Sequence, residues 1–537
     1  MNLTQYPYAS RRSVVMGRRG AVATAQPLAA VVGANVLAGG GNAVDAAVAM
    51  AIALTVLEPT ANGLGSDAFA LVWDGRLHGL NGSGRSPQVL HPDVLTALES
   101  GGAAAGNQMP LYGWPAVTAP GAVSAWQALW KRWGSLPFHQ LCEPAIRYAQ
   151  EGFPVSPQVA RLWGAERSHY MGLQGPEFRA FREVFFAGGR APKAGEVWSS
   201  LGHARTLQSL AETEGESFYR GEIAEAIVDF ATVTGGTVSL ADLDAHKADW
   251  VEPIGTRYRD VEVWELPPNG QGVTALMALN ILEGFEVGRW PRDSVESVHL
   301  QVEAMKLAFA DAYRHVADPV AMQVGVEQML DKGYAARRRG LIGDRAIQMA
   351  ASGLPQGGTV YLAAADGELM VSLIQSNFRN FGSGIVVPDT GISLQNRGSG
   401  FSLEPTHPNC VAAGKRPFHT IIPSFLTRDG VPMGPMGLMG AHMQPQGHVQ
   451  MVVNLVDYGM NPQAALDAPR WCVERGNQVS VEQLMPAHVA LGLEDRGHAV
   501  TVEASSVLFG KGQMILRDGS VLMGASEPRG DGMVIAL

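Results

Sequence analysis

Apolar positions follow a helical period twice within the first 60 residues. They recur at this spacing over residues 26–38, and Gly39-Gly40-Gly41 then marks the end of the helix. Asn42 is a suitable N-cap for a second helix over residues 44–57. The second helix is apolar on nearly every side, which predicts that it lies in the interior of the protein.

Strand patterns are concentrated in two predicted hairpins, each with apolar runs on both sides of an Asp-Gly turn. The first hairpin comprises residues 68–73 and 76–80 around Asp74-Gly75, and the second comprises residues 359–365 and 369–375 around Asp366-Gly367. Further strands are expected at residues 423–427 and 449–456 and in a run of short strands at the C-terminus.

The middle third is predicted to be largely helical. Helical patterns cover residues 122–132, 141–151, 204–213, 222–232, 273–282 and 294–316. Residues 341–350 show no clear period, and residues 351–358 have the glycine and proline content of a loop. A chain that is rich in helices first and in strands later suggests sheets covered by helices, an α+β layered core.

Composition supports a globular protein and argues against nucleic-acid binding. Of the 537 residues, 46% are hydrophobic and only 17% are charged, which excludes a disordered chain. The formal net charge is −10, and an acidic chain without a basic stripe is a poor partner for nucleic acid.

The cysteines indicate neither a disulfide framework nor a zinc site. Cys142, Cys410 and Cys472 are odd in number, far apart and outside any C-x-x-C pair. We expect each to be a small buried hydrophobic residue, and we expect neither a metal nor a cofactor.

The N-terminal segment resembles an export signal only superficially. Arg11-Arg12 is followed by Arg18-Arg19, which interrupts the apolar core that a signal requires. We therefore interpret the segment as a strand that enters the fold. No apolar run is long enough to span a bilayer, so the expected location is the cytoplasm, with no membrane partner.

The sequence Gly357-Gly358-Thr359 stands at the head of the second hairpin. Considered alone, it is an ordinary loop followed by an ordinary strand residue. Its context changes that interpretation, because short motifs in a characteristic order occur along nearly the whole chain. They are Gln26-Pro27-Leu28-Ala29, residues 39–47, Phe218-Tyr219-Arg220-Gly221, Asp242-Leu243, residues 303–311, Phe381-Gly382-Ser383-Gly384, Lys415-Arg416-Pro417, Met439-Gly440-Ala441, Asp457-Tyr458-Gly459 and Glu527-Pro528-Arg529.

In these motifs the chain resembles the γ-glutamyltransferase family of glutathione hydrolases, whose members are made as one precursor and cut before a threonine. The resemblance implies the αββα four-layer sandwich of the N-terminal-nucleophile hydrolases. It also implies cleavage between Gly358 and Thr359 into residues 1–358 and 359–537. The two fragments would form one domain as a heterodimer, and possible pairing of two such heterodimers is left open.

The proposed chemistry explains why a threonine is needed at the new N-terminus. A hydroxyl is a weak nucleophile until a base takes its proton. Cleavage before Thr359 would place a free α-amino group, with a reference pKa of about 7.7–8.0, on the same residue as the hydroxyl. Gly358 suits the preceding position because it allows the hydroxyl to approach its carbonyl group closely.

The resemblance also assigns supporting residues. Gly440 and Ala441 match a Gly-Gly turn whose backbone amides stabilise the oxyanion, and backbone N–H groups do not require a second glycine. Asn377 matches a family asparagine near the nucleophile. Gln375 occupies the place of a second threonine and is expected to support the site.

Departures from the family concern the substrate pocket. Gly400 stands where an aspartate is expected and Arg397 where a glutamate or glutamine is expected, with Asn396 beside it. His419 and Thr420 replace a pair of serines that hold the substrate carboxylate. Arg85 lies two residues from the position of the usual carboxylate-binding arginine, now Ser83. Arg85 and Arg397 are candidates for a carboxylate, since a guanidinium can grip both oxygens.

Residues 401–415 form a shorter segment than in typical members, which carry a lid over the site here. A more open site favours hydrolysis over transfer to an acceptor amino acid. The first functional prediction is therefore hydrolysis of γ-glutamyl amides such as glutathione. Two alternatives remain open: an amidase for a small acidic amide such as oxamate or for a cephalosporin-type acyl group, and an unprocessed homologue that only binds ligands.

Overall fold

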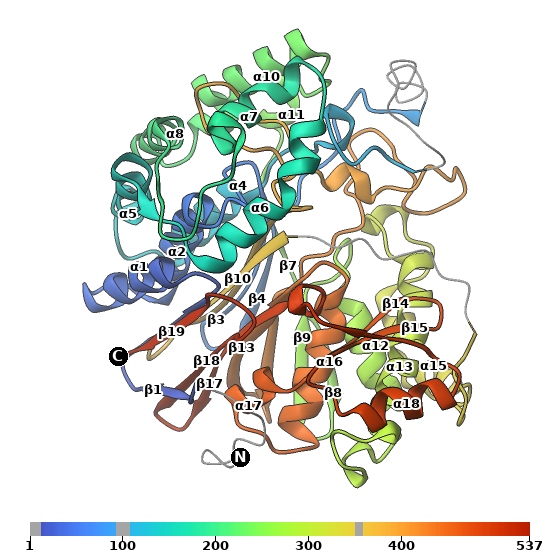
Figure 1. Ribbon diagram of the computed structural model, residues 1–537. Coiled ribbons are helices and arrows are strands. Elements are labelled where there is room, and N and C mark those ends of the chain that lie inside the picture. The colour runs from blue at the N-terminus through green and yellow to red at the C-terminus, as the bar shows by residue number, and fades with distance from the viewer. Residues whose placement is uncertain (1–11, 93–107, 349–357) are drawn as a thin grey trace.

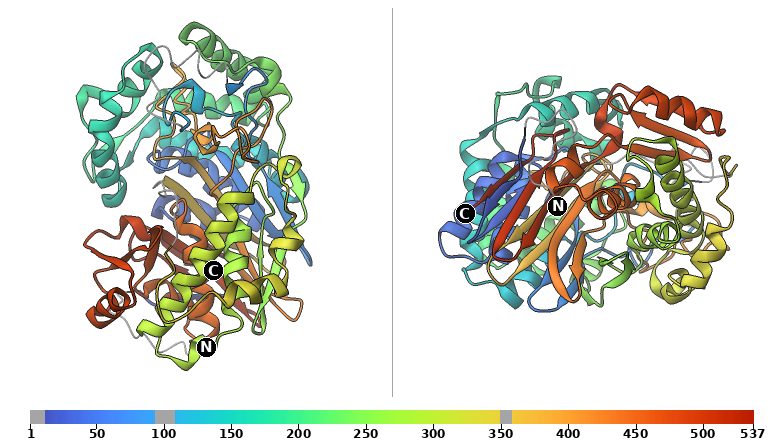
Figure 2. Two further views of the ribbon diagram at one scale, coloured as in Figure 1. Left: turned by 90° about the vertical axis from the view of Figure 1, so that its right-hand side faces the viewer. Right: turned by 90° about the horizontal axis from the view of Figure 1, so that it is seen from below.

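Two sheets are stacked face to face between layers of helices in the computed structural model (Figures 1 and 2). The structure describes residues 12–92, 108–348 and 358–537. The first sheet contains, in spatial order, β1 (Val15–Gly17), β18 (Val521–Ser526), β17 (Lys511–Asp518), β13 (Val431–Met439), β12 (Ser424–Arg428), β9 (Val261–Glu265) and β8 (Ile254–Tyr258). The second contains β19 (Met533–Ala536), β2 (Ala21–Thr24), β10 (Gly358–Ala365), β11 (Met370–Phe378), β3 (Asp67–Trp73), β4 (Leu77–Asn81) and β7 (Asp249–Val251).

Each sheet draws strands from both sides of the Gly358–Thr359 bond. In the first sheet, β12 from the C-terminal part pairs with β9 from the N-terminal part. In the second, the central hairpin of β10 and β11 pairs with β2 on one side and with β3 on the other. The two predicted fragments are thus interleaved in one fold.

Apolar side chains are buried in three layers, as stacked sheets between helices require. One layer lies between the sheets and includes Phe69, Tyr361, Ile374, Phe425 and Ile515. The other two lie between each sheet and its helices. β10 shows how alternation builds them: Val360, Leu362 and Ala364 face the helices, whereas Tyr361, Ala363 and Ala365 face the opposite sheet.

Helices cover the outer faces. Over the second sheet lie α1 (Pro27–Ala38), α2 (Ala43–Leu57), α4 (Ala122–Trp133), α5 (Phe138–Glu151) and α8 (Leu201–Glu212), in the upper left of Figure 1. Over the first lie α12 (Gly272–Leu282), α13 (Val295–His315), α16 (Met443–Val456) and α17 (Pro462–Asp467). The remaining larger helices are α6 (Pro157–Gly172), α10 (Glu222–Thr234), α15 (Lys332–Arg339) and α18 (Ala487–Asp495), and β14 (Trp471–Arg475), β15 (Gln478–Glu482) and β16 (Ala499–Glu503) form a separate small sheet.

The predicted cap and hairpins are confirmed. The Asn42 side chain accepts hydrogen bonds from the backbone amides of Val44 and Asp45, and the Asp45 carboxylate accepts one from the Asn42 backbone amide. α2 is fully buried along its length, as its uniformly apolar sequence predicts. Asp366 Oδ1 closes the turn between β10 and β11 by accepting hydrogen bonds from the amides of Glu368 and Leu369.

One predicted strand is wrong. Residues 449–456 lie in α16, which is buried over most of its length. Their run of apolar and β-branched residues satisfies a strand pattern, yet an interior helix can be apolar on all sides. The helices α6, α15 and α18 were not predicted from the sequence.

The burial of the cysteines and the length of the apolar helices test two further predictions. All three cysteines are free; Cys142 and Cys472 are buried as expected, whereas Cys410 is only partly buried. No helix in the described part of the chain is long and apolar enough to cross a membrane.

Candidate active site

The head of β10 brings a hydroxyl to the carbonyl group that precedes it. Thr359 Oγ1 lies 2.8 Å from the carbonyl oxygen of Gly358 and is almost completely buried. Ser376 Oγ, on the neighbouring strand β11, donates to the same oxygen at 2.7 Å and lies 3.1 Å from Thr359 Oγ1. The Phe378 amide donates to Ser376 Oγ at 2.7 Å, which directs the serine proton toward Gly358. The Gly358 carbonyl is therefore polarised by fixed hydroxyl groups.

Ser376 was not among the predicted site residues. The register of the hairpin contains the signal that would have found it. Val360 pairs with Gln375, so the next pair outward along the two strands is Thr359 and Ser376. By strand alternation, Ser376 faces the opposite sheet with Thr359, whereas Gln375 faces the helices.

The predicted role of Gly358 agrees with its surroundings. A Cβ atom on this residue would lie 2.9 Å from the carbonyl oxygen of Thr60 and 3.1 Å from the Cα atom of Asn380. Because these are backbone atoms, a side chain at position 358 would displace the chain around the predicted cleavage site. The strand is also irregular here, with a shift in pairing between Gly358 and Val360.

Unusual backbone conformations surround the same point. Phe378, Asn380 and Ala441 have positive φ angles of 77°, 48° and 51°. Such angles are costly for residues other than glycine and are concentrated at functional sites in proteins. Ala441 thus retains the left-handed conformation typical of glycine.

The contacts of β13 indicate that the turn at Gly440 and Ala441 lies toward the Thr359 end of β10. A Cβ on Gly434 would lie 3.0 Å from Met370 at the far end of the hairpin, and one on Gly437 would lie 2.2 Å from the Tyr361 ring. β13 therefore runs over β10 toward its Thr359 end. No acceptor in the described part of the chain takes the amide protons of Gly440 or Ala441. The pair stays a prediction for the oxyanion site, and its geometry is suitable.

Arg397 is the most unusual charged residue of the site. It is 1% exposed and donates through Nη1 to Thr420 Oγ1 at 2.7 Å, while its Nε and Nη2 have no acceptor. Its guanidinium lies 4.8 Å from the centre of the Phe378 ring. Burial lowers the pKa of Arg397 to about 9, with the nearby Asp67 opposing the change. A buried guanidinium with open donors is a ready binding site for an anion.

His419 has a structural environment. Its Nε2 is 3.0 Å from Asp67 Oδ2, and both side chains are fully buried. Burial, followed by the charges of Arg397 and Arg416, lowers the pKa of His419 well below its usual value. Burial raises the pKa of Asp67 to about 7 against the opposing effect of Arg397. A neutral His419 that donates to Asp67 explains this contact.

Three other predicted residues use their side chains within the protein. Asn377 contacts Ser66, Phe381 and Ser393. Gln375 accepts from Trp126 and donates to Ala51 and Asn62. Asn396 accepts from the Arg379 amide and donates to the Leu111 carbonyl. These contacts position the walls of the site and leave little capacity for a substrate.

Arg85 lies elsewhere. Its guanidinium pairs with Asp318 at 3.1 Å, also contacts the Gly414 carbonyl, and lines a separate pocket with His246 and Arg416. Because Asp318 already neutralises it, Arg85 is a weaker candidate for a substrate carboxylate than Arg397. Although Arg85 is close in sequence to the family position, its side chain lines this separate pocket.

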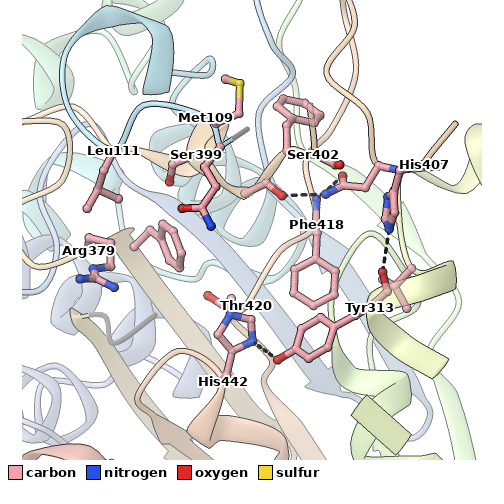
Figure 3. A pocket seen from close by; sticks show the side chains of 16 residues that line it. Met109, Leu111, Tyr313, Arg379, Ser399, Ser402, His407, Phe418, Thr420 and His442 are labelled. Atoms are coloured by element: carbon pink, nitrogen blue, oxygen red, sulfur yellow. Dashed lines mark hydrogen bonds between the residues drawn. The ribbon is translucent and has the colours of Figure 1, made fainter. Parts of the chain in front are cut away.

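A cavity of about 590 Å³ adjoins these residues (Figure 3). Its lining includes Phe378, which pairs with Gly358, together with Thr420, which contacts Arg397, and His442, which follows Ala441. Burial, and then the charges of Arg379 and Arg397, lowers the pKa of His442 to about 3, so this side chain is neutral near pH 7. Residues of the short 401–415 segment, including Phe401 and Asn409, also line the cavity.

A second polar cluster lies outside this site. His299, Glu303 and His498 place one potential ligand atom each within 4.8 Å of one another. Lys306 Nζ already contacts Glu303 Oε1 at 2.7 Å, and Glu303 Oε2 accepts the Ile347 amide. The lysine supplies the positive charge here, and the cluster anchors the segment that precedes residue 349.

Replacement of Ser376 by alanine should slow cleavage before Thr359 by about 100-fold, since it removes one donor to the Gly358 carbonyl. Ser376→Thr keeps a hydroxyl and is the matched control. The appearance of two bands on a denaturing gel, followed over time, gives the rate. Equal rates for the alanine variant and the unaltered protein would show that Ser376 has no part in cleavage.

Comparison with known proteins agrees with the fold. A cephalosporin acylase from Bacillus halodurans is 51% identical in sequence, with a TM-score of 0.93 over 100% of this chain and 99% of that chain. The glutathione hydrolase-like YwrD proenzyme of Bacillus subtilis (strain 168) is 36% identical over 97% of this chain and 99% of its own length. The oxamate amidohydrolase proenzyme of Klebsiella pneumoniae is 32% identical over 93% of this chain and 94% of its own length.

Stacked sheets between helices, with the candidate nucleophile heading a central strand, define an N-terminal-nucleophile hydrolase fold of the αββα type. Residues 29–537 match the sequence model of the gamma-glutamyltranspeptidase family. The chain belongs to this family of hydrolases and transferases.

Proposed function

We propose that the chain cleaves itself before Thr359 and then hydrolyses amides whose acyl group carries a carboxylate. The observation that carries the proposal is the contact of two hydroxyl groups, from Thr359 and Ser376, with the carbonyl oxygen of Gly358. The names of the relatives support processing, because the YwrD and oxamate amidohydrolase relatives are both proenzymes.

Cleavage would begin with attack of Thr359 Oγ1 on the Gly358 carbonyl carbon. The C–O bond forms, the C–N bond breaks, and the departing nitrogen takes a proton to become the free α-amino group. Water then hydrolyses the ester, which releases the Gly358 carboxylate and restores the hydroxyl. Residues 1–358 and 359–537 would remain together as a heterodimer.

Amide hydrolysis would reuse the same atoms. The α-amino group takes the hydroxyl proton, directly or through water, and Thr359 attacks the substrate carbonyl. The departing amine takes the proton that the α-amino group had accepted and leaves an acyl-threonine ester. Water then hydrolyses that ester, which releases the acid and restores the hydroxyl. The amides of Gly440 and Ala441 are proposed to stabilise the negative charge on the oxygen in both steps.

Arg397 is the proposed partner of the acyl carboxylate. Two of its donor nitrogens have no acceptor although the side chain is fully buried. A buried donor without a partner is costly, and a carboxylate would satisfy both nitrogens at once. Thr420 fixes the guanidinium from the other side.

The described lining offers no partner for a substrate ammonium group. It contains no aspartate or glutamate, and a side chain at Gly400 would come within 2.8 Å of the Phe418 carbonyl oxygen. Asp67 is already engaged by His419 and by the Gly121 amide. This favours acyl groups such as glutaryl or oxalyl over γ-glutamyl groups. Hydrolysis of γ-glutamyl amides stays as the second candidate function, supported by the similarity to the glutathione hydrolase-like relative.

Glutaryl-p-nitroanilide and γ-glutamyl-p-nitroanilide form a matched pair that differs only in the α-ammonium group. We expect kcat/KM to be at least about tenfold higher for the glutaryl donor, since an unpaired charge in the pocket costs at least ~1.4 kcal/mol. Adding Gly-Gly as an acceptor should barely raise p-nitroaniline release, because the segment over the site is short.

Thr359→Ala is the blank for both assays. A higher kcat/KM for the γ-glutamyl donor than for the glutaryl donor would favour the second candidate function, hydrolysis of γ-glutamyl amides. Turnover of neither donor by correctly cleaved protein would overturn both.

A further inference from the structure

Arg379 carries the only fixed charge among the described residues that line the cavity. The rest of this lining is apolar, through residues such as Met109, Leu111 and Phe418, or uncharged and polar. In Figure 3, Arg379 lies beside Leu111, on the side of the cavity away from Tyr313 and His407. A single guanidinium in such a lining gives one part of the cavity a strong preference for anions.

The backbone of Arg379 is fixed, while its side chain is not engaged. Its amide donates to Asn396 Oδ1 at 3.0 Å, and its carbonyl oxygen accepts from the Tyr170 hydroxyl at 3.1 Å. Within the described residues, the guanidinium has neither a hydrogen-bond acceptor nor a carboxylate partner. Asn396 also holds Leu111, so one side chain positions two walls of the cavity.

Its place in the chain puts Arg379 next to the reaction centre. The preceding residue, Phe378, pairs with Gly358 and donates its amide to Ser376 Oγ. Arg397 and Arg379 differ in burial, because Arg397 is 1% exposed whereas Arg379 is only partly buried. The buried cation suits the acyl group, which stays on the enzyme as an ester. The more exposed one suits the amine that departs.

We propose that Arg379 forms a subsite for a carboxylate on the leaving amine, so that the preferred substrates are amides between a carboxylated acyl group and a carboxylated amine, such as an N-acyl amino acid. This inference rests on the proposed function and deepens it. The guanidinium would bind the carboxylate in the ground state and in the step that breaks the amide bond. It would have no contact with the acyl-enzyme after the amine has left.

Glutaryl-4-aminobenzoate and glutaryl-4-aminobenzamide test this subsite, since they share the acyl group and differ in the charge of the leaving amine. The carboxamide is the more electron-withdrawing substituent, so chemical reactivity alone favours the neutral donor. At low ionic strength we expect kcat/KM of the processed protein to be about ten- to hundredfold higher for the benzoate, the range expected for hydrogen bonds to a charged group. The preference should fall as salt is added.

Arg379→Gln should bring the two kcat/KM values close together by lowering only that for the benzoate. Its unchanged activity on the benzamide is the internal control for folding and cleavage. Equal kcat/KM values in the unaltered protein would overturn the subsite and leave the proposed function standing, and this result needs no variant. An equal loss on both donors in Arg379→Gln would assign Arg379 to the acyl group and likewise overturn the subsite. Hydrolysis of neither donor would overturn both proposals.

Discussion

Replacement of Thr359 by alanine should leave the protein as one chain of 537 residues and remove its amidase activity. The hydroxyl that lies 2.8 Å from the Gly358 carbonyl oxygen is both the proposed cleaving group and the proposed nucleophile, so one change should remove both functions. We expect activity to fall by at least about 1,000-fold, as is usual when a hydrolase loses its nucleophile. A denaturing gel and N-terminal sequencing of the smaller fragment measure cleavage directly.

Thr359→Ser is the matched control, because it keeps the hydroxyl and should still produce two fragments. A smaller fragment that begins at a residue other than 359 would contradict the assignment. A protein that remains one chain without any substitution would instead support the non-catalytic interpretation of its site.

The second large effect is expected at Arg397. Arg397→Ala should lower kcat/KM for glutaryl-p-nitroanilide by at least about tenfold, which corresponds to ~1.4 kcal/mol of lost transition-state stabilisation. Cleavage before Thr359 should change less, since that peptide bond needs no carboxylate contact. Thermal stability should hold or rise, because the substitution removes a buried charge whose donors are unsatisfied.

Arg397→Lys keeps the positive charge but removes the planar pair of donors, since an ammonium group cannot bind both carboxylate oxygens as a guanidinium does. We expect it to recover only part of the lost kcat/KM. Kinetics and melting temperature should be measured on the same processed preparation. A lower melting temperature with unchanged kcat/KM would make Arg397 a structural residue.

Local patterns predicted the parts of this fold that local chemistry determines. Asn42 caps α2, and Asp366 closes the central hairpin, through contacts that span three residues or fewer. The α16 helix was misassigned because its strand-like residues are stabilised by burial against distant elements, which a sequence window does not contain.

In the candidate site, too, some residues can be predicted from local sequence and others depend on contacts between distant segments. Thr359 was predicted from an ordered set of motifs and stays a prediction. Ser376, which contacts Thr359, is signalled by the hairpin register and not by those motifs. Arg85 and Arg397 were equivalent in the sequence. Their difference arises from Asp318, 233 residues from Arg85, which pairs with that arginine and leaves Arg397 as the one with open donors. Ion pairs between distant segments decide such assignments, and no local pattern records them.

The interleaving of strands has a consequence for the lifetime of the processed molecule. β10 and β11 are held between β2 and β3, and β12 is held against β9, so each proposed fragment supplies strands on which the other is built. Separation of the fragments would expose the apolar layer between the sheets, to which both contribute. Fragments from different molecules therefore cannot be exchanged without unfolding. If the chain is cleaved as proposed, a molecule with one damaged fragment cannot regain activity by taking up an intact fragment from another molecule.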